Sequence, residues 1–228
     1  MKRILLMLFI LFSATVLSKE KYVVCLDPGH QTKGNPALEE IAPNSDKKKA
    51  KVTTGTRGVV TKKYESELML EIALKLKTSL ENKGYKVIMT RTKNDVDISN
   101  KERALMTNKA GCDVYLRLHA DAGGSSNRGA TVLTSSSKNP YTKSVQQSSD
   151  KFSKAILSEY TKATGFKSRG VSYRDDLTGT NWSTVTNTLL EMGFMTNSEE
   201  DRKMASPEFQ DVMVDGIING IEKYFKER

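Results

Sequence analysis

The two histidines of this chain both stand where an apolar segment gives way to a polar one. His30 follows the apolar residues 22–26 and a Pro-Gly turn, and His119 closes the segment 113–118. Short apolar runs bounded by turn residues predict β-strands. Ligands of open α/β sheets bind at the edge where the parallel strands end. The two histidines are therefore candidate ligands of a metal ion at that edge.

A metal site of this kind also needs carboxylates. A catalytic zinc ion commonly takes three protein ligands from His and Glu, with a fourth position open to water. Glu65 is the leading third ligand because it begins a predicted helix directly after a long loop. Glu67 and Glu71 are rivals, although Glu71 lies more than a turn inside the helix. Glu191 follows an apolar segment, where the pKa of its carboxyl group would rise, and is a candidate proton acceptor for an attacking water.

Each candidate also has a purely structural interpretation. A histidine at a strand end is more often hydrogen-bonded than metal-bound. Glu65 alone could complement the dipole of its helix, and Glu191 alone could cap the turn that follows it. The joint pattern of two histidines and a glutamate, all at the ends of predicted strands, is what favours a metallohydrolase.

The elements that must carry these residues alternate along the chain. Apolar residues at helical spacing predict helices over 65–83, 144–161 and 208–225, and Ser99 and Glu102 are spaced like a capping box before a shorter helix. Residues 31–63 are predicted to be a long polar loop. The alternation predicts a single α/β domain with a mostly parallel, twisted sheet of about six strands and helices on both faces. The predicted strands cover 22–26, 85–90, 113–118, 130–134, 170–173 and 184–190.

The N-terminus and the charge suggest an exported protein. Lys2 and Arg3, the apolar residues 4–12 and a small-residue site at 16–18 are typical of a secretory signal peptide over residues 1–18, which leaves a domain of residues 19–228. The net charge of +9 becomes +7 once residues 1–18 are removed. A basic secreted protein suits an anionic surface such as the cell wall. Nucleic acid is disfavoured because no basic stripe with interleaved aromatic residues is present.

The two cysteines leave two interpretations open. Cys25 and Cys112 each lie within or just before a predicted strand that ends in a histidine. A disulfide is possible if those strands are neighbours. The commoner alternative is that both are small apolar core residues.

Several motifs together resemble one enzyme family. They are the segments 26–30 (LDPGH), Glu65 ahead of 70–73, 83–87 with 90–91, 116–121 (LRLHAD) and 190–197 (LEMGFMTN). In this order they resemble the catalytic domain of zinc-dependent N-acetylmuramoyl-L-alanine amidases, the amidase-3 family. The resemblance covers about residues 21–226.

The resemblance implies a fold, an activity and a site. It implies that His30, Glu65 and His119 bind one zinc ion and that Glu191 is the catalytic acid/base. The substrate would be peptidoglycan, cleaved at the amide bond between the lactyl group of N-acetylmuramic acid and L-alanine. We expect a monomer that acts in the periplasm or cell wall, with no membrane contact after signal cleavage. Ser66 and Glu67 stand where the family often has Lys and Asn, which keeps Glu67 as the rival of Glu65.

Two other functions fit the same residues. A zinc peptidase acting within the stem or cross-bridge would release different products. A wall-binding module on the same fold would bind peptidoglycan without dissolving it.

Overall fold

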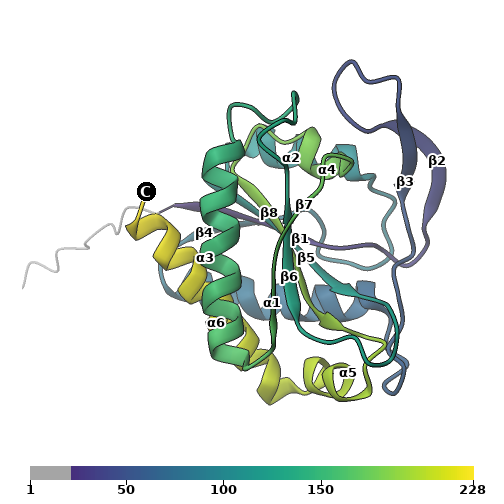
Figure 1. The fold of residues 1–228 in the computed structure, drawn as a ribbon, viewed down its shortest axis with the longest axis vertical. Helices are drawn as coiled ribbons and strands as arrows, with labels where there is room; N and C mark the ends of the chain where they lie inside the picture. Colours follow the sequence, from purple (N-terminus) through teal and green to yellow (C-terminus); the bar gives the residue numbers. More distant parts are fainter. Residues whose placement is uncertain (1–21) are drawn as a thin grey trace, which may run out of the picture.

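A six-stranded sheet forms the centre of the computed structural model, which describes residues 22–228 (Figure 1). The predicted signal peptide lies outside the described residues. The strand order is β4-β1-β5-β8-β6-β7, and every pair is parallel except β6 with β8. The predicted single α/β domain with a mostly parallel sheet is confirmed. The strands are β1 (Val23–Pro28), β4 (Lys86–Met89), β5 (Val114–Asp121), β6 (Ala130–Thr134), β7 (Ser168–Tyr173) and β8 (Asn187–Phe194).

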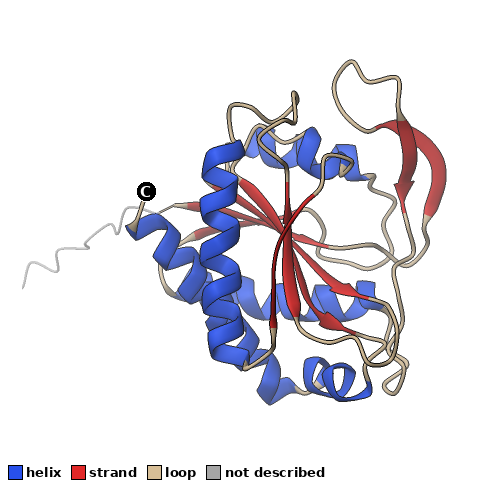
Figure 2. Cartoon of the chain, viewed as in Figure 1, coloured by secondary structure: helices blue, strands red, loops and turns tan. Residues whose placement is uncertain are grey.

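Helices cover both faces of this sheet (Figure 2). Three long helices share one large apolar core with the sheet: α1 (Glu65–Asn82), α3 (Gln146–Thr164) and α6 (Pro207–Lys226). The opposite face packs against α2 (Asn100–Ala110) and the short α4 (Thr178–Asn181) around a smaller core. Alternate residues of each strand point to opposite faces, so Leu116 and Leu118 enter the large core, whereas Tyr115 enters the small one.

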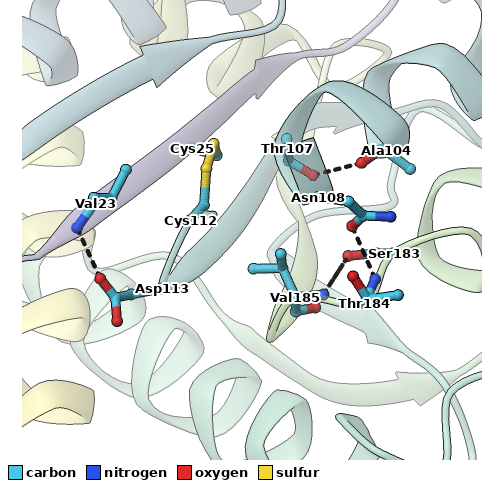
Figure 3. Close-up of a disulfide and its surroundings, with 10 residues drawn as sticks. All are labelled: Val23, Cys25, Ala104, Thr107, Asn108, Cys112, Asp113, Ser183, Thr184 and Val185. Atoms are coloured by element: carbon cyan, nitrogen blue, oxygen red, sulfur yellow. Dashed lines mark hydrogen bonds between the residues drawn. A yellow bond between two sulfur atoms is a disulfide. The ribbon is translucent and has the colours of Figure 1, made fainter. Parts of the chain in front are cut away.

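The smaller core contains a disulfide between Cys25 and Cys112 (Figure 3). The two Cα atoms are 5.9 Å apart, and the link joins the middle of β1 to the segment that leads into β5. The Asp113 carboxylate next to it accepts a hydrogen bond from the backbone N–H of Val23 at 2.9 Å. Of the two interpretations of the cysteines, the structure therefore selects the disulfide.

Three parts of the structure differ from the sequence prediction. The predicted loop 31–63 contains an antiparallel hairpin of β2 (Asn35–Glu40) and β3 (Lys48–Val52). The helix α5 (Ser198–Ala205) was not predicted. Glu191 lies inside β8, which continues to Phe194, and not after the end of the strand. Within residues 22–228, none of the helices combines the length and apolar character needed to cross a bilayer.

Candidate metal centre

Three side chains that are distant in sequence meet at the carboxyl edge of the sheet. His30 follows β1, Glu65 begins α1, and His119 lies near the end of β5. His30 Nε2, His119 Nδ1 and Glu65 Oε1 are 3.1 Å from one another in every pairing. Ligands bound to zinc at 2.0–2.1 Å in a tetrahedron lie about 3.3 Å apart. The three atoms therefore fit three corners of a tetrahedral metal site.

Contacts with the backbone fix the orientation of two of the three side chains, His30 and Glu65. His30 Nδ1 is 2.8 Å from the carbonyl oxygen of Thr53, which assigns the proton to Nδ1 and leaves Nε2 free to bind a metal. Glu65 Oε2 accepts a hydrogen bond from the Thr56 N–H at 2.9 Å, and Oε1 accepts one from the Ala120 N–H at 3.0 Å. The site is thus oriented by backbone groups as well as by side chains.

Two glycines make room for the ligands. A Cβ atom on Gly29 would lie 2.4 Å from Cε1 of His119. A Cβ atom on Gly55, whose φ is +83°, would lie 2.7 Å from Glu65 Oε2 and 2.8 Å from the His30 ring. A side chain at either position would displace a ligand, so both glycines belong to the cradle of the site.

The rival carboxylates point elsewhere. Glu67 is exposed, and its side chain accepts a hydrogen bond from the Tyr64 N–H at the start of α1. Glu71 forms an ion pair with Lys63. Among the three glutamates, only Glu65 reaches the two histidines.

The ionisation of the cluster suits metal binding. Burial alone would raise the pKa of Glu65, but its interactions with the His119 and His30 rings hold that pKa well below its usual range. Burial lowers the pKa of His119 to about 4, and its hydrogen bond to the Glu65 carboxylate only partly opposes this. At neutral pH the site therefore presents a carboxylate and a neutral imidazole, which are the forms that bind metals.

Glu191 completes the site from the neighbouring strand. Its Cα pairs with that of His119 in the parallel register of β5 and β8. Glu191 Oε2 is buried and has no hydrogen-bond partner among the described residues. Burial, followed by the negative charges of Glu65 and Asp121, raises the pKa of Glu191 well above its usual range, and Arg117 opposes this. The direction of this shift agrees with the expectation from the sequence, but Glu65, Asp121 and Arg117 make the setting more charged than the predicted apolar one.

A buried charge cluster beneath the site was not predicted. The Asp27 side chain is completely buried and accepts hydrogen bonds from Thr90 (2.6 Å) and Arg103 (2.8 Å) on one oxygen and from Tyr115 (2.9 Å) and Arg117 (3.1 Å) on the other. Burial would raise the pKa of Asp27, but the charges of the two arginines keep it well below its usual range. Asp27 therefore remains a carboxylate that binds both guanidinium groups.

Arginines from this region hold the turn that carries His30. Arg103 donates to the carbonyl oxygens of Pro28 and His30 at 2.9 Å each, and Arg91 donates to those of Pro28 and Gly29, also at 2.9 Å. His30 has a φ of +60°, a left-handed conformation that non-glycine residues rarely adopt. The guanidinium groups of the two buried arginines stabilise this conformation, because they bind the carbonyl oxygens of the turn.

The unpredicted helix α5 anchors two loops of the site. Asp201 accepts hydrogen bonds from the backbone N–H groups of Val60 and Thr61 at 2.7 and 2.9 Å, in the loop that leads to Glu65. Glu200 accepts one from Gly129. The spacing of Asn197 and Glu200 is a helix-start signal that could have revealed α5, since Asn197 caps it.

The family of the chain follows from comparison with known proteins. The sequence model of a family described as N-acetylmuramoyl-L-alanine amidase (Amidase_3) matches residues 24–223. The chain belongs to this family. It is therefore a hydrolase of the N-acetylmuramoyl-L-alanine amidase type.

Individual family members agree with the assignment. The amidase AmiC of Escherichia coli is 25% identical in an alignment of 243 positions, which covers 90% of this chain and 53% of AmiC. An N-acetylmuramoyl-L-alanine amidase of Mycobacterium tuberculosis is 24% identical, with 92% and 88% covered. The crystal structure of the amidase Ami1 from Mycobacterium smegmatis superposes with a TM-score of 0.83 at 26% identity, covering 91% of this chain and 98% of Ami1.

Proposed function

We propose that this chain is a zinc-dependent amidase of peptidoglycan, with zinc held by His30, Glu65 and His119 and with Glu191 as the catalytic acid/base. The observation that carries the proposal is the equal 3.1 Å spacing of the three ligand atoms. The substrate is the amide bond between the lactyl group of N-acetylmuramic acid and L-alanine of the stem peptide. Family membership supports this choice of bond.

Zinc, when bound, would polarise the scissile carbonyl group and make a water molecule more acidic. Glu191 takes a proton from the water as its oxygen attacks the carbonyl carbon. The same carboxyl group then gives this proton to the alanine nitrogen as the C–N bond breaks. The products are a lactyl carboxylic acid on the glycan and a peptide with a free amino terminus.

The surroundings of Glu191 suit this double role. Its Oε2 atom is buried without a competing hydrogen bond, so the carboxyl group can turn to either the water or the leaving nitrogen. Its raised pKa makes it a better proton acceptor than an exposed glutamate. Glu191 stays beside His119 because the two residues pair across the neighbouring strands β8 and β5.

The cellular setting is part of the proposal. Residues 1–18 would direct export, and the mature chain would act as a monomer in the periplasm or cell wall. Its net charge of +7 without those residues would favour binding to an anionic wall.

Two measurements on the purified chain test the proposal. Metal analysis should give one zinc per chain, and mass spectrometry of digested peptidoglycan should find intact stem peptides that begin with alanine. Products cut within the stem or cross-bridge would indicate a peptidase instead. Binding to peptidoglycan without any release of soluble product would indicate a wall-binding module.

A further inference from the structure

The cleft that contains the candidate metal centre has a volume of about 790 Å³ and is also lined by three basic residues. We call Lys49, Arg117 and Arg174 together the basic end of the cleft. It lies on the α2 and α4 face of the sheet, to which His119 and Glu191 also point. A substrate bound at the metal centre can therefore extend along the same cleft to these cations.

The side chain of Arg117 is held in place by its contacts, and one of its guanidinium nitrogens forms no hydrogen bond with the described residues. Its side chain is only 4% exposed, its Nε donates to Asp27 at 3.1 Å, and its Nη2 donates to Asn100 at 2.7 Å. The backbone of Gly179 packs so closely that a Cβ there would lie 2.7 Å from Cζ of Arg117. The same Cβ would lie 2.8 Å from Nη1, which forms no hydrogen bond with residues 22–228. Nη1 keeps some accessible surface, and Arg117 lines the cleft.

The outer part of the basic end carries more positive than negative charge. Lys49 and Arg174 both form ion pairs with the one carboxylate of Asp176, at 2.5 and 2.9 Å. Asp176 cannot neutralise both cations. Asp27 forms ion pairs with both Arg117 and Arg103, so its single negative charge cannot neutralise both arginines. Positive charge therefore remains at the basic end.

The spacing fits a particular part of the substrate. Arg117 and His119 are two residues apart on one strand, so their Cα atoms are separated by about 6.6 Å. In an extended peptide, the residue after the leaving alanine carries its carboxyl group about two residue lengths, or about 7 Å, beyond the scissile bond. A free carboxylate at that position would lie about as far from the scissile bond as Arg117 lies from His119 along β5.

We propose that the basic end is a specificity subsite for a free carboxylate on the residue that follows L-alanine in the stem peptide. This proposal rests on the proposed amidase function. Guanidinium groups bind carboxylates through charge-assisted hydrogen bonds that a carboxamide replaces only weakly. The chain would therefore favour stems with a free carboxylate over amidated stems.

The test compares two soluble substrates, N-acetylmuramoyl-L-alanyl-D-glutamate and its α-carboxamide. The zinc-loaded wild type should cleave the acid with a kcat/KM about 10-fold higher than that for the amide. Arg117→Gln and Arg174→Gln should bring this ratio toward one, whereas Asp176→Asn should increase it because it leaves Lys49 and Arg174 unneutralised. Lys162→Gln, on the far side of the sheet, should leave the ratio unchanged.

The outcomes separate the subsite from the amidase function. A wild-type ratio near one, or a ratio unchanged in both folded arginine variants, would overturn the subsite. If Arg117→Gln does not fold, the half-exposed Arg174 and Asp176 decide the question. Failure to cleave either substrate or intact peptidoglycan would instead reject the amidase function.

Discussion

Glu191 on β8 lies directly opposite His119 on β5, and the buried atoms His119 Nε2 and Glu191 Oε2 both lack a hydrogen-bond partner among the described residues. Buried polar atoms are rarely left unpaired unless a ligand or a reaction uses them. The pair of strands thus brings the proposed metal ligand and the proposed proton carrier to adjacent positions. Because the sheet is rigid, their separation does not depend on a mobile loop.

Replacing the proton carrier should abolish most activity without removing the metal. Glu191→Gln preserves the size of the side chain but cannot accept a proton, and we expect kcat to fall by about 10²–10⁴-fold. The zinc content and thermal unfolding of the variant should show a loaded, folded protein. Glu199→Gln, on the exposed surface of α5, is the matched control and should retain full activity. Wild-type rates in a zinc-loaded Glu191→Gln protein would contradict the assignment.

The same residue should make the metal-free protein less stable at high pH. The pKa of Glu191 in the folded protein is raised above the ordinary 4.5, so its protonated form stabilises the fold at low pH. This contribution is lost as the pH rises from about 4.5 through the folded pKa. In a chelator, Glu191→Gln should therefore have a higher Tm than wild type at pH 8, by about 2–4 °C for each kcal/mol gained. The difference should shrink toward pH 4.5, and an equal difference at both pH values would refute this explanation.

Filling the cradle should weaken metal binding. In Gly55→Ala, the new methyl group would displace Glu65 and the ring of His30, and we expect zinc affinity to fall by about 10–100-fold. Gly84→Ala is a close control, because Gly84 also has a φ of +83° but has nothing within 4 Å of its Cβ position. Competition with a zinc chelator measures both variants. Equal losses of affinity would mean that backbone strain, and not the contact with Glu65, is responsible.

The anchor from α5 should matter for both stability and metal affinity. Asp201→Asn weakens the hydrogen bonds that hold Val60 and Thr61, at a cost of about 1–3 kcal/mol in the free energy of unfolding. Since this loop leads to Glu65, zinc affinity should fall as well. Urea unfolding and chelator competition measure the two effects. Asp211→Asn, at an exposed position of α6, should change neither quantity appreciably.

Loss of the disulfide should be costly because it closes a long loop. Cys25 and Cys112 are 87 residues apart, and a link of that span stabilises a fold by about 4.6 kcal/mol in the chain-entropy description. Cys112→Ser should therefore lower the midpoint of urea unfolding. Reductant should lower the midpoint of the wild type to a similar value and leave the variant unaffected. A wild-type midpoint insensitive to complete reduction would disprove the estimate.

The sequence was most informative where one face of an element is buried. The apolar spacing within 65–83 predicted α1 nearly to its last residue, because Leu68, Ile72 and Leu76 all enter the core. The hairpin β2 and β3 gave no such signal, since it has little core to cover and Leu38 is 65% exposed. The helix α5 was missed because it is short and highly charged.

The sequence was enough to predict which three side chains come together at the candidate site. It was not enough to predict the buried charged residues that hold them in place. His30 and His119 stood out because the chain has no other histidine, and position at a helix start distinguished Glu65. The buried arrangement of Asp27 with Arg103 and Arg117 was not predictable, because single charged residues in a sequence are most simply assigned to the surface. Only the three-dimensional register brings Asp27 beside Arg117.

The three ligand atoms come from segments 35 and 54 residues apart, so a bound ion would act as a cross-link across the first half of the chain. A ligand that binds only the native state stabilises it in proportion to the logarithm of its free concentration. The lifetime of the protein against proteases would then follow the supply of zinc around it. Metal scarcity would reduce the number of surviving molecules as well as the activity of each one.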